Sequence, residues 1–320
     1  MNSTMKSKLT IEQIQRITAE TMKEKVVSLK ELSDGWANTA YAIQLEDDRK
    51  VILKAAPVKG FKTMRCERDN MRAEVEALRL VQAQSNGVPI PQVYTYDPSG
   101  SLVPCEYFLM EYLEGEPYNK VKEALSPEAR DGIEFALGDY NRRINAIQGK
   151  RFGYFCLENG SASTWKDAFQ ILMEDLLLDG KEAGIELPLS YEALEREVES
   201  RLDACSEVNV PQLVHWDLWD GNVFVKDERI VGIIDFERSL WADPLMEVYF
   251  GKFNSSSTAY RRGYGKEHFT EAERVRRDLY VLYLDLVMVI ECYYRQYENK
   301  DHIAWAHSNL KEGLEALKMK

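Results

Sequence analysis

The sequence lacks the features that mark several broad classes of protein. Its opening segment, MNSTMKSKLT, has no apolar stretch, so we expect no secretory signal peptide. The longest apolar run, residues 279–290, is interrupted by Asp285 and is shorter than the roughly 20 residues that span a bilayer. The net charge of -12 disfavours a nucleic-acid partner, because phosphate backbones are bound by basic surfaces. We therefore expect neither a membrane nor a nucleic acid as partner.

Cysteine is scarce and scattered. The five cysteines are odd in number and none stands in a C-x-x-C pair, which disfavours a disulfide framework and a zinc site. Isolated thiols are typical of a reducing compartment, so we expect a cytoplasmic protein. The composition, 45% hydrophobic and 29% charged over 320 residues, is otherwise ordinary for a globular chain of one large or two moderate domains.

The first third of the chain is rich in strand patterns. A capping box at Thr10 and Gln13 predicts a first helix over residues 11–22. The segments KVVSLKEL, TAYAIQL and KVILKAA are alternating or β-branched and are separated by turn residues, which predicts three antiparallel strands. Helical spacing then predicts a helix over residues 63–84, and further strand segments precede LEGEPY.

The chain beyond LEGEPY is mainly helical in pattern. The aromatic-rich segment after residue 290 predicts a packed terminal helix, with a contact to a second copy as the alternative. The expected fold is therefore α+β, with a β-rich lobe over residues 1–112 and a larger, mainly helical lobe over residues 113–320. Helix starts are predicted at Ser126-Pro127, at Ser163 or Thr164, at Ser190, and at a capping box of Thr270 and Glu273 that opens a helix through Tyr294.

The segment LVHWDLWDGNVFV, residues 213–225, crowds polar side chains between apolar ends. VFV and the later IVGIIDF have the pattern of a hairpin joined by the turn KDER. Because a hairpin brings the start of its first strand near the end of its second, Asn222 and Asp235 should be neighbours in space. Amide and carboxylate oxygens are hard ligands that suit Mg²⁺, so this pair is a candidate metal site.

Asp217 lies just upstream of the predicted metal site. A carboxylate there could accept a proton from an incoming hydroxyl, so the set would provide metal ligands and a base, as phosphoryl transfer requires. The structural alternative is a well-capped Asp-Gly-Asn turn. We expect His215 to hydrogen-bond the backbone and hold Asp217 in place.

The order of these motifs resembles the aminoglycoside phosphotransferase family, the antibiotic- and choline-kinase-like branch of the protein-kinase-like fold. The motifs are His215-x-Asp217-x-x-x-x-Asn222, then I-I-Asp235-Phe-Glu, then A-Asp243-Pro244. The resemblance covers nearly the whole chain and implies a two-lobed fold. It also implies that Asp243 braces the catalytic loop, while an N-cap for a helix starting at Pro244 is the alternative role, and both could hold.

The same resemblance implies a nucleotide site in the first lobe. Lys54, in VILKAA, matches the lysine that holds the phosphates of ATP, and Glu74, or else Glu67, matches its partner on the next helix. Physical reasoning agrees, because an unpaired lysine inside an apolar strand is costly, although an edge-strand lysine facing water is the alternative. The predicted nucleotide contacts are Ser33, Asn38 and Thr39 in SDGWANTAYAI, and Glu111 to Leu113 in the hinge, with Glu111 and Leu113 at its ends.

The reaction implied is transfer of the γ-phosphoryl group of ATP, with Mg²⁺, to a hydroxyl of a small molecule. The chain has no A-P-E and no long activation segment after Asp235, which disfavours a protein kinase. Alternatives are a catalytically silent nucleotide-binding regulator of the same fold and a metal-dependent hydrolase, which would not need Lys54. Carboxylates with aromatic rings suit an amine-bearing acceptor such as an aminoglycoside. The candidate acceptor residues are Trp219, Glu237, Trp241, Glu247, Tyr283, Asp285, Glu291 and Tyr294.

Overall fold

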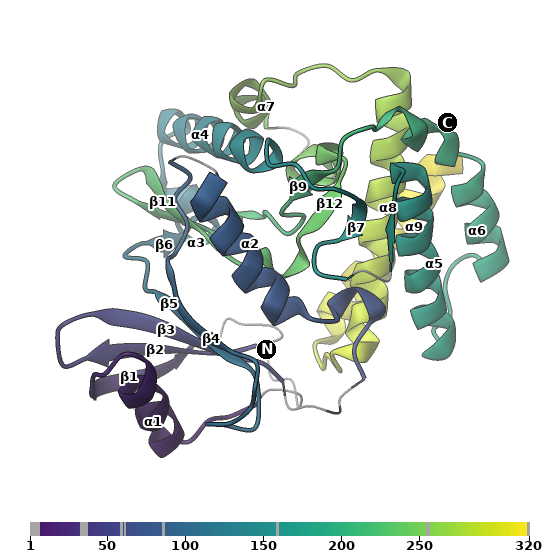
Figure 1. Ribbon diagram of the computed structural model, residues 1–320. Coiled ribbons are helices and arrows are strands. Elements are labelled where there is room, and N and C mark those ends of the chain that lie inside the picture. Colours follow the sequence, from purple (N-terminus) through teal and green to yellow (C-terminus); the bar gives the residue numbers. More distant parts are fainter. Residues whose placement is uncertain are drawn as a thin grey trace.

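The computed structural model describes residues 7–32, 38–57, 60, 62–84, 87–157, 160–253 and 257–318. A β-rich lobe, formed by the first part of the chain, sits beside a larger and mainly helical lobe (Figure 1). The α+β class and the two-lobed arrangement expected from the sequence are thereby confirmed. In the part of the chain that is described, no helix has the length and apolar character needed to cross a membrane.

The first lobe is built on an antiparallel sheet with the strand order β1-β2-β3-β5-β4. Its β3 side chains alternate between two faces, because successive residues of a strand point in opposite directions. Leu53 packs in the cluster that contains Ile14 of α1, whereas Ile52 packs with Val75 of α2 on the other face. Lys54 has the same parity as Ile52 and so faces α2. The elements are α1 (Ile11–Thr21), β1 (Val26–Leu32), β2 (Thr39–Leu45), β3 (Lys50–Ala55), α2 (Asn70–Gln84), β4 (Val93–Asp97) and β5 (Tyr107–Glu111).

The helix expected over residues 63–84 is shorter than predicted. A short 3-10 turn covers Arg65–Glu67, and α2 begins only at Asn70. Asp69 has a φ of 58°, a left-handed conformation that interrupts any helix. The backbone N–H of Arg65 donates to Asp179 Oδ2 at 2.7 Å. Tertiary contacts therefore override the helical pattern of this segment.

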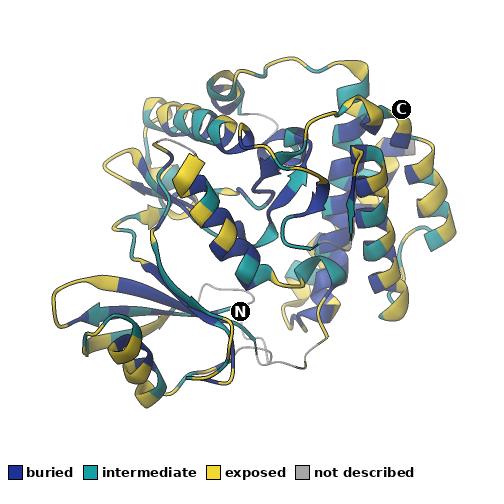
Figure 2. Ribbon diagram, viewed as in Figure 1, coloured by how far each residue is buried: buried dark blue, intermediate teal, exposed yellow. Residues whose placement is uncertain are grey.

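The second lobe gathers its helices around small sheets and the buried helix α8 (Figures 1 and 2). The predicted capping residues Ser126, Thr164, Ser190 and Thr270 all accept a backbone N–H at helix starts, so those predictions are confirmed. The strands are β6 (Glu116–Pro117), β7 (Phe152–Tyr154), β8 (Ser161–Ala162), β9 (Gln212–Val214), β10 (Val223–Lys226), β11 (Arg229–Ile233) and β12 (Leu240–Ala242), and the helices are α3 (Tyr118–Val121), α4 (Pro127–Asn145), α5 (Trp165–Glu182), α6 (Tyr191–Glu199), α7 (Thr258–Tyr264), α8 (Glu271–Tyr294) and α9 (Lys300–Lys318).

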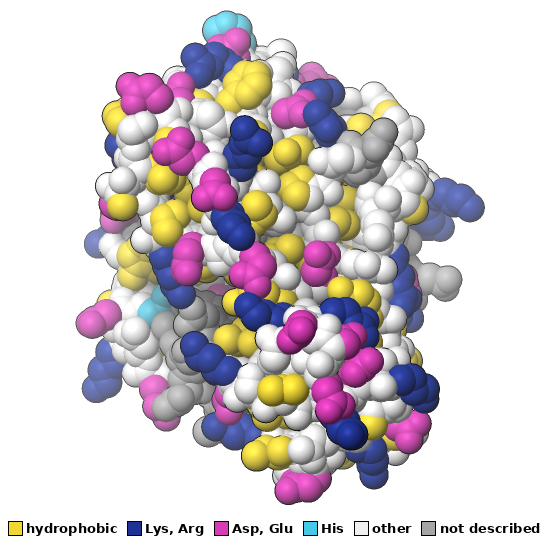
Figure 3. Space-filling model, turned by 90° about the vertical axis from the view of Figure 1, so that its left-hand side faces the viewer, with side chains coloured by type: hydrophobic (Ala, Val, Ile, Leu, Met, Phe, Trp, Pro, Cys, Tyr) yellow, Lys and Arg dark blue, Asp and Glu magenta, His cyan; other side chains and the backbone are white. Residues whose placement is uncertain are grey.

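The last helix, α9, is a packed terminal helix, as the sequence indicated. Its side chains Ala306, Leu310, Leu314 and Leu317 are buried in the same apolar cluster as α8. On the face shown in Figure 3, acidic and basic side chains are interspersed over both lobes.

Candidate active site

The predicted hairpin places Asn222 beside Asp235. Strands β10 and β11 pair antiparallel with Val223 opposite Ile233, and the Ile234 N–H donates to the Asn222 carbonyl at 3.0 Å. The turn residues Asp227 and Glu228 both have positive φ, 49° and 58°, as a tight type I′ connection requires. The expected proximity is therefore confirmed.

Lys54 lies between two carboxylates from different parts of the chain. Its Nζ donates to Glu74 Oε1 at 2.6 Å and to Asp235 Oδ1. Lys54 is only 7% exposed and Glu74 is fully buried, so the alternative of an edge lysine facing water is wrong. The lesser candidate Glu67 accepts from Arg295 Nε at 2.8 Å instead.

Burial and charge act against each other in this triad. Burial alone would lower the pKa of Lys54, but the neighbouring carboxylates outweigh it and raise that pKa. Burial raises the pKa of Glu74 to about 8. Burial would also raise the pKa of Asp235, yet the Lys54 ammonium holds it below its usual value. One lysine charge thus pairs mainly with Asp235, and Glu74 keeps a proton more readily than an exposed glutamate.

Asp217 lies against Asn222 in the loop before the hairpin. Asn222 Nδ2 donates to the Asp217 carbonyl at 2.8 Å and to its carboxylate Oδ2 at 3.4 Å. Burial raises the pKa of Asp217 to about 7. A carboxylate with a pKa near neutral is suited to accept a proton at neutral pH.

The backbone is strained at the residue before Asp217 and at Asp235. Trp216 has a φ of 65° and Asp235 a φ of 63°. A left-handed conformation is costly for a residue as bulky as tryptophan, and such strain is concentrated at functional sites. The strain supports a functional role for the loop over that of an ordinary capped turn.

His215 makes the backbone hydrogen bond expected from the sequence. Its Nε2 lies 2.8 Å from the Ile234 carbonyl, and Nε2 must be the donor because a carbonyl oxygen only accepts. Burial lowers the pKa of His215, which favours the neutral ring. His215 therefore fastens the loop of Asp217 to the strand end that carries Asp235.

Glu247 braces the loop, a role that the sequence analysis did not find. Its carboxylate accepts the backbone N–H of His215 at 2.9 Å and of Trp216 at 3.1 Å. The expected brace, Asp243, instead accepts from Leu245 N–H at 3.1 Å and from Arg276 Nε at 2.8 Å. The N-cap alternative for Asp243 is thus the one observed. The available signal for Glu247 was a second carboxylate four residues after Asp243.

The predicted nucleotide contacts fall in several environments. Ser33 lies outside the described residues. Asn38 Nδ2 donates to Glu237 Oε2 at 3.0 Å, so it reaches the segment after Asp235, and Thr39 is buried at the start of β2. Glu111 ends β5, and the side chain of Leu113 packs closely over Gly232 of β11.

Most of the predicted acceptor residues are engaged within the protein. Glu291 accepts from Arg238 at 2.5 Å, and Glu237 lies 3.9 Å from Arg295. Trp241 stacks on Phe155 with ring centroids 5.2 Å apart. Trp219 is 39% exposed, whereas Asp285, Tyr283, Tyr294 and Glu247 are buried.

The oxygens of Asn222 and Asp235 fit a hard divalent cation. The amide nitrogen of Asn222 is used by Asp217, which leaves its oxygen for a ligand. No group of three or more His, Cys, Asp or Glu side chains in the described residues could hold a metal ion. A two-residue set is typical of Mg²⁺ that is shared with substrate phosphates and water.

The fold is that of known phosphotransferases. The chain superposes on a thermostable mutant of aminoglycoside phosphotransferase APH(4)-Ia in complex with AMP-PNP and hygromycin B, with a TM-score of 0.68 and 18% identity. The superposition covers 95% of this chain and 98% of that one. The chain also superposes with a TM-score of 0.64 and 16% identity on APH(2")-IIa in its streptomycin–ATP complex, over 96% and 97% of the two chains. These likenesses establish a protein-kinase-like fold.

Sequence comparison gives the family. The model of the phosphotransferase enzyme family matches residues 28–279, and the chain belongs to that family. The resemblance expected from the motifs is therefore confirmed. A curated relative, acyl-CoA dehydrogenase family member 10 of Mus musculus, is 24% identical over 262 residues. That match covers 77% of this chain but only 22% of the relative, so the chain corresponds to a small part of that protein's length.

Proposed function

We propose that this protein transfers the γ-phosphoryl group of ATP to a hydroxyl of a small molecule. The observation that carries the proposal is Lys54, buried between Glu74 and Asp235 and thus fixed where β3, α2 and the β11 end meet. A lysine held in this way serves to neutralise phosphates next to a metal-binding carboxylate. In this proposal residues 1–112 bind the nucleotide, and residues 113–320 carry the catalytic loop and the acceptor region.

The proposed step gives each residue one task. Asp217 orients the acceptor hydroxyl and receives its proton as a bond forms between the acceptor oxygen and the γ-phosphorus. The bond from that phosphorus to the β,γ-bridging oxygen breaks, and ADP leaves with the electron pair. Lys54 holds the phosphates, and Asn222 and Asp235 would hold Mg²⁺. When bound, that ion supplies positive charge against the phosphates. The predicted contacts Ser33, Asn38, Thr39, Glu111 and Leu113 belong to the proposed nucleotide site.

The test is ADP release from Mg-ATP in the presence of small alcohols, with Asp217→Asn beside the native protein. Loss of the base should lower kcat by about 100- to 10,000-fold while ATP still binds. Asp227→Asn is the matched control, because Asp227 lies in the exposed turn of the same hairpin and asparagine tolerates its positive φ. Turnover that survives Asp217→Asn unchanged would contradict the proposed role.

The second candidate is the nucleotide-binding regulator. If the protein is such a regulator, Mg-ATP binds but no alcohol promotes ADP release. The native protein and Asp217→Asn would then show the same ADP release. The raised pKa of Asp217 favours the enzyme, because a purely binding site has no need of a half-buried carboxylate whose pKa is raised toward neutrality beside the proposed metal ligand Asn222.

A further inference from the structure

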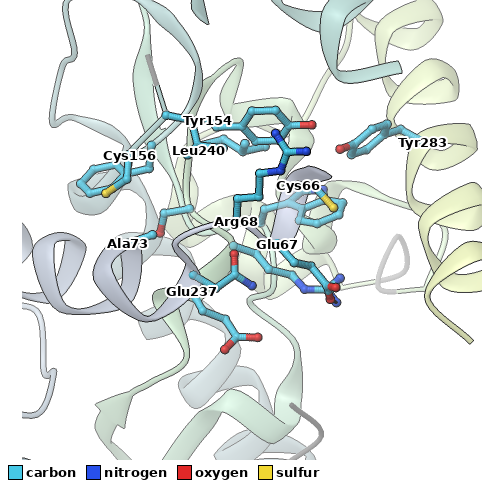
Figure 4. A pocket seen from close by; sticks show the side chains of 15 residues that line it. Cys66, Glu67, Arg68, Ala73, Tyr154, Cys156, Glu237, Leu240 and Tyr283 are labelled. Carbon is cyan, nitrogen blue, oxygen red and sulfur yellow. Dashed lines mark ion pairs between the residues drawn. The ribbon is translucent and has the colours of Figure 1, made fainter. Parts of the chain in front are cut away.

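A pocket is lined by side chains of α2, β7 and α8 and by Trp216, the residue before the proposed base; Figure 4 shows its lining side chains. Trp216, Glu237 and Arg238 line it, and they flank Asp217 and Asp235 in sequence. The Arg238 charge also acts on Asp217: burial raises the pKa of that carboxyl, and Arg238 opposes the rise. The pocket is therefore next to the point where a hydroxyl must meet Asp217.

The walls of this pocket are largely apolar and aromatic. Tyr154, Phe155, Leu240 and Tyr283 line it together with the strained Trp216. The hollow holds about 420 Å³ that no atom fills, open solvent included, and its enclosed part, about 20 Å³, has room for about one water molecule. A small acceptor would therefore lie across the open mouth of the hollow, with a flat or extended apolar body against the edges of these rings.

The carboxylates around the pocket already have partners within the same chain. Glu67 accepts from Arg295 at 2.8 Å, and Glu291 accepts from Arg238 at 2.5 Å. Glu237 accepts from Asn38 and lies 3.9 Å from Arg295. An amine that entered the pocket would have to displace one of these buried arginines, which is costly.

Arg68, an exposed residue, differs from the other charged residues that line the pocket. No ion pair or side-chain hydrogen bond joins it to any described residue, and its side chain extends toward the rings of Tyr154 and Tyr283 (Figure 4). Its charge is felt by Asp175, where burial raises the pKa and Arg65 and Arg68 oppose the rise. Asp175 pairs with Arg65, at 3.9 Å, and leaves the Arg68 guanidinium available.

We propose that the acceptor is a small hydroxy acid: its hydroxyl meets Asp217, its apolar body lies against the aromatic rings at the mouth of the hollow, and its anionic group is bound by Arg68. This deepens and rests on the proposed phosphotransferase function. The γ-phosphoryl group goes to the hydroxyl oxygen, ADP leaves and the hydroxyl proton is released, while the acid group takes no part in bond making. The amine-bearing acceptor suggested by the sequence becomes the competing outcome.

Two sets of matched alcohols test the proposal. The first is para-(hydroxymethyl)benzoate, its methyl ester and para-(hydroxymethyl)benzylamine; the second is ω-hydroxyhexanoate, its methyl ester and aminohexanol. ADP release from Mg-ATP is followed for each, and binding is measured by calorimetry with Mg-AMP-PNP present. In each set, we expect the carboxylate to be turned over faster, or bound more tightly, than the matching ester and the matching amine.

Substitution of Arg68 then separates recognition from catalysis. Arg68→Gln should raise KM for the carboxylate acceptor by about 10- to 100-fold and leave KM for ATP unchanged, because a charge-assisted contact is lost. Arg68→Glu should shift the preference toward the amine of the same set. Arg79→Gln is the control, as Arg79 is exposed on the same helix, α2, away from the pocket lining.

The outcomes distinguish the two proposals. Asp217-dependent phosphorylation of the amines alone, unaffected by Arg68→Gln, would overturn the hydroxy acid and leave the phosphotransferase intact. Failure of every carboxylate to bind or turn over would also overturn it, provided that Mg-ATP binds. If Mg-ATP bound neither the native protein nor the Asp235→Asn variant, the proposed function itself would be contradicted.

Discussion

At the scale of single residues, Glu247 fixes the geometry of the loop that carries Asp217. Its carboxylate accepts from two backbone N–H groups, of His215 and Trp216, and from the side-chain amides of Asn141 and Asn145. Glutamate can accept from all of these donors because both its oxygens carry charge, whereas glutamine would turn a donor toward one of them. The position of Asp217 therefore depends on a residue that would not touch the substrate.

We expect Glu247→Gln to lower kcat by about 10- to 100-fold with little change in KM for ATP, since charge-assisted hydrogen bonds to the loop are lost. Steady-state kinetics with Mg-ATP and an alcohol acceptor would measure the split between kcat and KM. Glu267→Gln, at an exposed position, is the control. A variant with native kcat but lower thermal stability would show that Glu247 has only a structural role.

The Lys54–Glu74 pair makes a second prediction at this scale. Lys54→Met leaves Asp235 and the buried Glu74 without their shared cation, and should lower the free energy of unfolding by about 3 kcal/mol. Lys54→Met with Glu74→Leu should recover part of that loss, because an apolar pair needs no charge partner, yet remain inactive. Denaturant unfolding of the single and double variants measures the recovery. If the single and the double variant were equally stable, Glu74 would be neutral and uncoupled from Lys54 in the native protein.

Local patterns explain which of these residues could be predicted. Lys54 interrupts an apolar strand and Glu74 follows on the next helix, so their pairing could be inferred from strand and helix geometry. Asn222 and Asp235 could be paired from the hairpin alone. The roles of Glu247 and Arg68 could not be assigned, because they depend on how separate elements pack. The sequence singled out Glu247 only as a candidate acceptor residue, and Arg68 not at all.

At the scale of elements, caps predicted helix starts well, but tertiary contacts decided where α2 begins. Residues 63–69 have helical spacing, yet Arg65 is held by Asp179 of α5 and Glu67 by Arg295 after α8. These contacts lie more than a hundred positions away in sequence, so no local signal indicated them. The same non-helical segment, residues 63–69, places Arg68 at the pocket. The late start of α2 is therefore linked to the proposed acceptor site.

Asp285 provides a prediction on the packing of α8 against α9. It is buried and pairs with Lys252, although the sequence suggested an acceptor role. Burial raises its pKa from 3.8 to about 6, so the folded protein holds this proton more tightly than the unfolded chain. The associated stability is complete below the unfolded pKa and is lost as pH rises through about 6.

Asp285→Asn should remove this pH dependence. Between about pH 4 and about pH 7, the free energy of unfolding of the variant should fall by about 2 to 3 kcal/mol less than that of the native protein. Chemical denaturation at both pH values measures the difference. Glu315→Gln, at an exposed position on α9, should show no such change. Parallel pH profiles for Asp285→Asn and the native protein would contradict the burial argument.

At the scale of the whole molecule, α2 belongs to both lobes. Met71 and Val75 pack with the sheet of the first lobe, whereas Ala77, Leu78 and Val81 pack in the large cluster of the second. Polar contacts cross at the same place, since Lys54 reaches Asp235 and Asn38 reaches Glu237. A ligand bound between the lobes should therefore stabilise both at once.

Mg-ATP at about 100 times its Kd should raise the free energy of unfolding by about 2.7 kcal/mol, provided that it binds only the folded state. Because the site joins the lobes through Lys54 and Asp235, we expect one cooperative transition that shifts as a unit. Thermal scans monitored by tryptophan fluorescence and by circular dichroism would follow the unfolding of both lobes. Asp235→Asn should lose most of the shift with Mg-ATP, since the proposed metal site is weakened. A shift confined to one of two separate transitions would place the nucleotide within a single lobe.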